Sequence, residues 1–170
     1  MFNFLKKNKP EVSPEYQQWR EMVLGMKPTD DLKGIPEELY GVLMDVGMGG
    51  GKDRYLAISL YAFNTGEASL KASLGAGVIG LGNNSENSEH AKRIVQIGQS
   101  LIHLTIPTKK YDYPEAGNVD FYFITTSGIR FFKCEIDEIR NGHPFAEIFS
   151  LFTIIKRFAD QIMEKQKNSA

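Results

Sequence analysis

Three short runs of alternating apolar residues follow one another in the chain: YGVLMDVGM at residues 40–48, YLAISLYAF at residues 55–63 and ASLKASL at residues 68–74. Alternation with a period of two is typical of strands that bury one face. In the first run the even-numbered residues share one face, and Asp45 falls on the other. The sequence Asn-Thr-Gly-Glu at residues 64–67 is a hairpin signal. The pattern therefore predicts three consecutive antiparallel strands.

Two further strands and three helices complete the expected fold. Apolar spacing predicts helices from Pro14 to Met26, from Ser88 to Ile106 and from Pro144 onward. Strands at residues 118–125 and 129–136 flank a short turn. The element order α-β-β-β-α-β-β-α predicts an α+β fold, with helices packed on a mainly antiparallel sheet of about five strands. Profilin-like and roadblock-like folds share this layout, an analogy of element order that carries no function.

The length of 170 residues suits one domain. We expect a flexible N-terminal segment at residues 1–12, a single α+β domain at residues 13–164 and a disordered tail at residues 165–170. The first residues, MFNFLKKNK, place apolar residues before the lysines, the reverse of a signal peptide. No run approaches the ~20 apolar residues of a membrane-spanning helix. A weak membrane-surface anchor is the alternative to a frayed terminus.

Charge and cysteine content exclude several classes of protein. Twenty basic and 21 acidic residues give a net charge of −1, whereas nucleic-acid binding usually needs clustered positive charge. Cys134 is the single cysteine, so an internal disulfide is impossible, and its place in an expected strand indicates a buried, inert thiol. The three histidines lack metal-ligand spacing. We expect a bacterial cytoplasmic protein with no nucleic-acid partner, no metal site and no cofactor.

Glycines are concentrated in the run GAGVIGLG at residues 75–82. Gly75, Gly77 and Gly80 fit the spacing G-x-G-x-x-G, in which backbone N–H groups approach a pyrophosphate. The preceding strand belongs to a hairpin, however, and the next helix begins several residues later, which both disfavour a dinucleotide site. A structural bulge or close backbone crossing is one alternative. Another is an anion site, whose candidate lining side chains are Lys71, Ser73, Asn83, Asn84 and Ser85.

Asp45 and His143 are two further candidate ligand-binding residues. Asp45 lies in the middle of an expected strand, where acids are uncommon, and a solvent-facing position is the alternative. His143 precedes Pro144 at a helix start, where capping or turn packing is the alternative. The sequence contains no serine-hydrolase elbow of the kind G-x-S-x-G. We assign no catalytic residue, and the pattern favours a protein that is not an enzyme.

The last expected helix has a broad apolar surface. Its apolar residues between Phe145 and Met163 cover more than one face, whereas one core contact needs a stripe of only about 100°. The helix is therefore either sandwiched within the domain or buries a second face against another subunit. For the second case we expect a homodimer whose interface includes Phe145, Phe149, Phe152 and Phe158.

Several motifs resemble those of a group of small bacterial proteins without an established function. The likeness begins with PEELYGVLMD at residues 36–45. It continues with Gly66, Ser69, Leu70, Ser73, Gly75, Gly77, Ile79 and Gly80. It returns in Phe121-Tyr122, in residues 125–128 and in Gly-His-Pro-Phe at residues 142–145. The resemblance covers roughly residues 34–163. It implies that the glycine run and the Gly-His-Pro turn belong to a shared core, and it supplies no active site.

Three classes of function remain open from the sequence. The first is a non-catalytic interaction module that self-associates through the last helix, which the broad apolar surface favours. The second is a protein, whether an enzyme or not, that binds a small anion, phosphate or nucleotide at the glycine run with Asp45 or His143. The third is an immunity-like or antitoxin-like protein that neutralises a partner. We favour the first.

Overall fold

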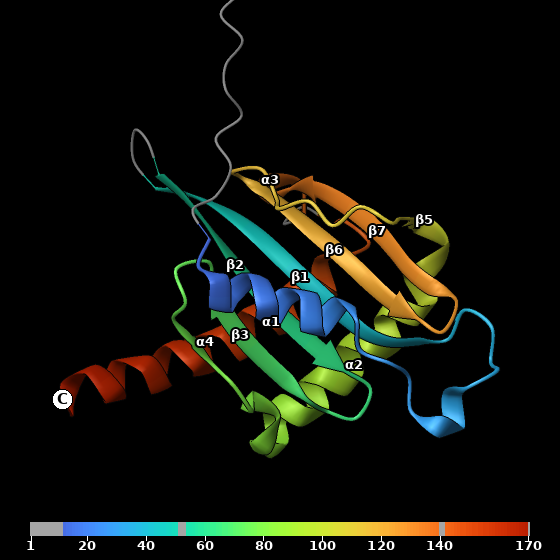
Figure 1. Cartoon of the computed structure of the whole chain (residues 1–170), viewed down its shortest axis with the longest axis horizontal. Coiled ribbons are helices and arrows are strands. Elements are labelled where there is room, and N and C mark those ends of the chain that lie inside the picture. The colour runs from blue at the N-terminus through green and yellow to red at the C-terminus, as the bar shows by residue number, and fades with distance from the viewer. Residues whose placement is uncertain (1–11, 51–53, 140–141, 170) are drawn as a thin grey trace, which may run out of the picture.

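The computed structural model of the chain describes residues 12–50, 54–139 and 142–169. Its centre is a seven-stranded antiparallel sheet with the order β4-β3-β2-β1-β6-β7-β5 (Figure 1). The strands are β1 (Leu39–Gly50), β2 (Arg54–Phe63), β3 (Ala68–Ala72), β4 (Gly77–Val78), β5 (Ile106–Pro107), β6 (Asn118–Thr125) and β7 (Gly128–Glu135). The α-helices are α1 (Pro14–Leu24), α2 (Ser85–Leu101), α3 (Ile136–Ile139) and α4 (Ala146–Asn168).

The α+β class predicted from the sequence is confirmed, and the strand count differs. The two additional strands, β4 and β5, form the edges of the sheet and have two residues each. Strands this short contain no alternation, so a periodicity argument does not detect them. Two-residue edges also leave few unpaired backbone groups for other chains to pair with.

The helices lie on both faces of the sheet. Figure 1 shows α1 across one face, while α2 and α4 lie on the opposite face. Trp19 and Val23 of α1 pack with Leu43 of β1 and Tyr122 of β6. The larger cluster, on the other face, joins α2 and α4 to the sheet through residues such as Phe152. The centre of the sheet is therefore buried on both faces, with a separate apolar cluster on each.

Strand β1 divides its side chains between these two clusters almost as its alternation predicts. Val42 and Met44 belong to the cluster under α2 and α4, and Leu43 belongs to the cluster under α1. Tyr40 is the exception, since it packs on the α1 side. A register irregularity between Leu39 and Gly41 in the pairing with β6 accounts for the switch, because one extra residue moves a side chain to the other face.

The ends of the helices also differ from the expected ones. Helix α2 starts at Ser85, where Asn84 caps it by accepting a hydrogen bond from the N–H of Asn87, and it ends at Leu101. Helix α4 extends to Asn168, through most of the segment expected to be a disordered tail. The expected flexible segment lies almost wholly outside the described residues. Among the residues that the structure describes, no helix is both long enough and apolar enough to cross a membrane.

Candidate functional site

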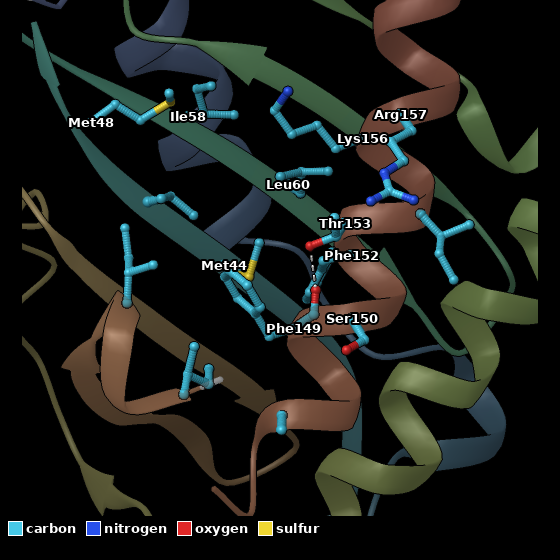
Figure 2. Close-up of a pocket in the computed structure, with 15 residues that line it drawn as sticks. Met44, Met48, Ile58, Leu60, Phe149, Ser150, Phe152, Thr153, Lys156 and Arg157 are labelled. Atoms are coloured by element: carbon cyan, nitrogen blue, oxygen red, sulfur yellow. Dashed lines mark hydrogen bonds between the residues drawn. The ribbon is translucent and has the colours of Figure 1, made fainter. Parts of the chain in front are cut away.

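An apolar groove of about 670 Å³ lies between α4 and the adjoining face of β1 and β2. Its floor consists of alternate side chains from the two strands: Met44, Val46, Met48, Ile58 and Leu60. Its wall comes from α3 and the first three turns of α4. In Figure 2, Met44 and Leu60 face Phe149 and Thr153 across the opening.

The groove exists because β1 and β2 extend beyond their neighbours. The pairing of β1 with β6 ends at Val46, and the pairing of β2 with β3 ends at Ile58. The two strands continue as a pair to Gly50 and Arg54. This projecting part of the hairpin carries apolar side chains on the face toward α4, and Met48 is 44% exposed as a result.

The polar side chains of the groove lie on α4. The Thr153 hydroxyl donates a 2.9 Å hydrogen bond to the carbonyl oxygen of Phe149, so it is already satisfied within the helix. Lys156 and Arg157 lie one turn further along, and the Lys156 side chain extends toward Ile58 and Leu60 (Figure 2). None of the fifteen lining residues is an aspartate or a glutamate. The groove therefore combines apolar walls with positive charge.

The four phenylalanines expected at an interface occupy two different environments. Phe145 and Phe152 are fully buried inside the protein's own core. Phe145 stacks on Phe132 with ring centroids 4.2 Å apart. Phe149 and Phe158 are half-buried, and Phe149 lines the groove. Much of the broad apolar surface of α4 is thus used within the domain, so Phe145 and Phe152 are not available at the surface.

A second candidate site is a buried polar cluster beneath α1. The Arg20 guanidinium donates to the carboxylate of Asp45 at 2.8 Å, and neither side chain reaches solvent appreciably. The Ser59 hydroxyl donates to the other oxygen of Asp45 and is bonded to the Tyr16 hydroxyl, 2.6 Å away. Asp45 is therefore not solvent-facing. Its negative charge is paired and hydrogen-bonded, which is what stabilises a buried carboxylate.

Arg20 also connects α1 to the loop that precedes β6. Its Nη1 and Nη2 atoms donate to the carbonyl oxygens of Tyr111 and Asp112 at 2.8 and 2.9 Å. Its guanidinium lies between the rings of Tyr113 and Tyr122, 5.0 and 5.1 Å from their centroids. All these contacts constrain one side chain, so the cluster is built to hold the loop against the sheet.

Asp120 is the one member of the cluster whose hydrogen bonding is incomplete. It lies directly opposite Asp45 on the neighbouring strand and is 5% exposed. Among the described residues, its Oδ1 atom has no hydrogen-bond partner. Burial, and secondly the negative charge of Asp45, raise the pKa of Asp120 to about 7. A carboxyl group with these surroundings gains or loses a proton near neutral pH.

Several glycines of the run at residues 75–82 are required by the backbone geometry of the fold. A Cβ atom at Gly77 would collide with the carbonyl oxygen of Leu70, and one at Gly82 with that of Gly66. Gly75 and Gly80 have φ values of 101° and 77°, which favour glycine. A small cavity of about 330 Å³ beside Gly80 includes Asn83, but it also includes the carboxylate of Glu67, which disfavours an anion.

The other predicted ligand-binding residues do not converge on one site. Lys71, Ser73 and Ser85 do not line that cavity. Ser73 is buried, and its hydroxyl accepts a 3.2 Å hydrogen bond from the N–H of Ala57. Asp45 lies beneath α1, whereas His143 packs at the start of α4 on the opposite face of the sheet.

His143 and Cys134 both have packing roles. The His143 ring lies 5.3 Å from the Phe132 ring, and its Nδ1 accepts a 3.2 Å hydrogen bond from the N–H of Phe145. Cys134 is buried, and burial raises the pKa of its thiol to about 11, so the reactive thiolate is scarce at neutral pH. Among the described residues, no three His, Cys, Asp or Glu side chains form a group that could hold a metal ion.

Comparison with known proteins adds no relative. No family model, no curated protein and no solved structure matches this chain. The layout analogy and the resemblance to the bacterial group remain predictions, and function has to be argued from the groove and the cluster themselves.

Sequence reasoning missed the partner of Asp45 and the groove. Arg20 lies four residues after Tyr16 and three before Val23, on the apolar stripe of α1, and a basic residue there signals a buried carboxylate partner. The groove left no comparable signal. Its exposure depends on where the neighbours of β1 and β2 stop pairing, which alternation alone does not show.

Proposed function

We propose that the protein is a non-catalytic interaction module that binds a polypeptide segment in the groove between α4 and the β1–β2 hairpin. One observation carries the proposal: an apolar groove of about 670 Å³ exposes Met48 and Ile154 at 44% and 41%. Contiguous exposed apolar surface of this kind is typical of protein-binding sites. The fifteen lining residues that the structure describes include no histidine, cysteine or carboxylate, which favours binding over acid–base or nucleophilic chemistry.

A second supporting observation is the projection of the hairpin. An isolated two-stranded ribbon is marginally stable in water. The distal residues of β1 and β2 pair with each other while their apolar side chains face an open groove. A bound segment would bury those side chains and stabilise the hairpin, which gives binding a favourable contribution that the free protein lacks.

Selection from a phage-displayed random peptide library tests the proposal. The double variant Met48→Asp/Ile154→Asp places two charges in the groove and serves as the counter-selection target. The matched control Leu104→Asp/Ile106→Asp changes two exposed apolar residues away from the groove instead, one in the turn before β5 and one in β5. We expect peptides that bind the wild type and the control but not the groove variant.

Sedimentation velocity examines a second copy of the chain as the occupant, which is the homodimer expected from the sequence. A dimer that dissociates in Met48→Asp/Ile154→Asp would also support the groove as the binding surface. The proposal is wrong if the wild type stays monomeric at every concentration and the library yields no peptide that depends on the groove.

A further inference from the structure

We infer that the occupant of the groove is an acidic amphipathic α-helix of another protein, an inference that rests on the proposed function. The first argument concerns backbone hydrogen bonds. The floor is the face of a sheet in which β1 and β2 already pair with each other, with Met44 opposite Leu60 and Val46 opposite Ile58. Their N–H and C=O groups are not offered to a ligand. A segment lying on this face must satisfy its own backbone groups, and a helix does so.

The arrangement of the existing helices agrees with this. On the same face of the sheet, α2 packs along one side of α4 (Figure 1). The groove lies against β1 and β2 beside α4, with Phe149 and Thr153 in its wall. Packed helices have axes about 8–10 Å apart. A third helix would lie over Met48 and Ile58 and extend the helical layer across the hairpin.

The charge of the groove defines the polar side of that helix. Lys156 forms an ion pair with Asp160 at 2.7 Å. The Arg157 guanidinium forms no ion pair with any carboxylate of the described residues. None of the fifteen described lining residues is an acid, so carboxylates on the bound helix would meet the positive charge of Arg157, whereas that of Lys156 is already paired with Asp160.

Within the described part of the chain, no α-helix exposes an acidic amphipathic face of this kind. On the described α-helices, the large apolar side chains that are most exposed are Met22 of α1 and Ile154 of the groove itself, so a second copy presents only half-buried apolar side chains, such as Phe158, beyond these two. The N-terminal sequence MFNFLKKNK is apolar but basic, which like-charge repulsion from Lys156 and Arg157 disfavours. A different protein is therefore the better source of the helix.

Two designed peptides test the inference by fluorescence anisotropy. Each has about 18 residues, long enough to be helical, with leucine on one face and either glutamate or lysine on the other. We expect the Leu/Glu peptide to bind the wild type about fivefold or more tightly than the Leu/Lys peptide. Arg157→Glu should reduce or reverse that preference, and the matched variant Lys109→Glu, on a loop outside the groove, should preserve it.

Each outcome decides between the helix and its alternatives. Met48→Asp/Ile154→Asp should abolish binding of both peptides, and circular dichroism verifies that the variant is folded; Ile154→Gln is a milder substitute if it is not. Equal or tighter binding of the Leu/Lys peptide, or no binding of either peptide, overturns the inference. If library selection meanwhile yields neutral or basic sequences that need the groove, the proposed function stands and only the acidic helix is wrong.

Discussion

The ion pair between Arg20 and Asp45 beneath α1 holds several parts of the protein together. Arg20 contacts Asp45, two backbone carbonyl oxygens and two aromatic rings. Burying a charge costs several kcal/mol unless a partner and hydrogen bonds compensate. Here every contact of Arg20 with the loop depends on Asp45 keeping the guanidinium in place, so the pair acts as a single structural unit.

Removing Arg20 should therefore be far more damaging than removing an exposed arginine. Arg20→Met leaves the Asp45 carboxylate buried without its countercharge, and we expect a loss of about 3–5 kcal/mol in the free energy of unfolding. Arg93→Met is the matched control, because Arg93 forms an exposed ion pair with Glu147, and should cost less than about 1 kcal/mol. Urea denaturation measures both. Similar losses in the two variants would contradict the structural role given to Arg20.

Asp120 makes stability depend on pH. Its pKa is about 7 in the folded protein and near 3.8 in the unfolded chain. The folded state therefore holds the proton more tightly, and its stability falls as pH rises from about 4 to 7, then levels off. Asp120→Asn removes this loss, so we expect it to be more stable than the wild type at pH 8, by roughly 1–3 kcal/mol, and nearly equal at pH 4. Denaturant melts at both pH values measure the difference in stability between the variant and the wild type. The same difference at pH 4 and pH 8 would contradict the raised pKa of Asp120.

The sequence drew attention to Asp45 but not to its surroundings. Its mid-strand position marked it as unusual, whereas Arg20 is 25 residues away in the chain and Asp120 is 75 residues away. Which strand lies beside β1, and in which register, decides that Asp45 faces Asp120. Local pattern carries no information on either, so the carboxyl pair was not predictable.

At the scale of the elements, the glycine run should behave as a packing device. Gly77→Ala would push a methyl group into the carbonyl oxygen of Leu70, which β3 cannot move cheaply. We expect a loss of about 1–3 kcal/mol by thermal or urea melts. Gly49→Ala is the matched control in β1, where an added methyl group has open space, and it should be neutral or slightly stabilising. Equal stability of the two variants would contradict the close strand crossing.

Some residues of helix α4 are needed for the fold, and others are available for binding. Phe152 is fully buried and Ile154, two residues later, is 41% exposed. Phe152→Asp should unfold the protein, because the buried carboxylate has no partner, and Ile154→Asp should keep the fold while weakening binding in the groove. Circular dichroism and peptide anisotropy measure the two effects. A folded Phe152→Asp protein would show that the core under α4 is misassigned.

Helices and strands with strong periodicity were predictable from the sequence. The short edge strands and the irregular pairing beside them were not. The long strands and helices α1, α2 and α4 appear close to the expected residues because alternation and 3.6-residue spacing are local properties. The four-residue helix α3 was not predicted. The two-residue strands β4 and β5, and the bulge that moves Tyr40 across the sheet, depend on tertiary pairing. The groove belongs to the same category.

For the molecule as a whole, β1 is shared by the two apolar clusters. Leu43 contributes to one and Val42 to the other, so loss of either cluster disturbs the central strand. We expect cooperative unfolding, in which the fluorescence of Trp19 in α1 and the far-UV circular dichroism of all helices change at the same urea concentration. An earlier fluorescence change would show that α1 detaches as a separate unit.

The contacts between Arg20 and the loop before β6 span 91 and 92 residues of chain. During synthesis the first helix therefore leaves the ribosome well before the carbonyl groups that secure it, by roughly 5–18 seconds at 5–20 residues per second. Throughout that interval Trp19 and Val23 have no completed sheet to cover them. Helix α1 is thus fixed only after a loop about 90 residues later has been made, so nascent chains leave its apolar side chains open to aggregation during that interval.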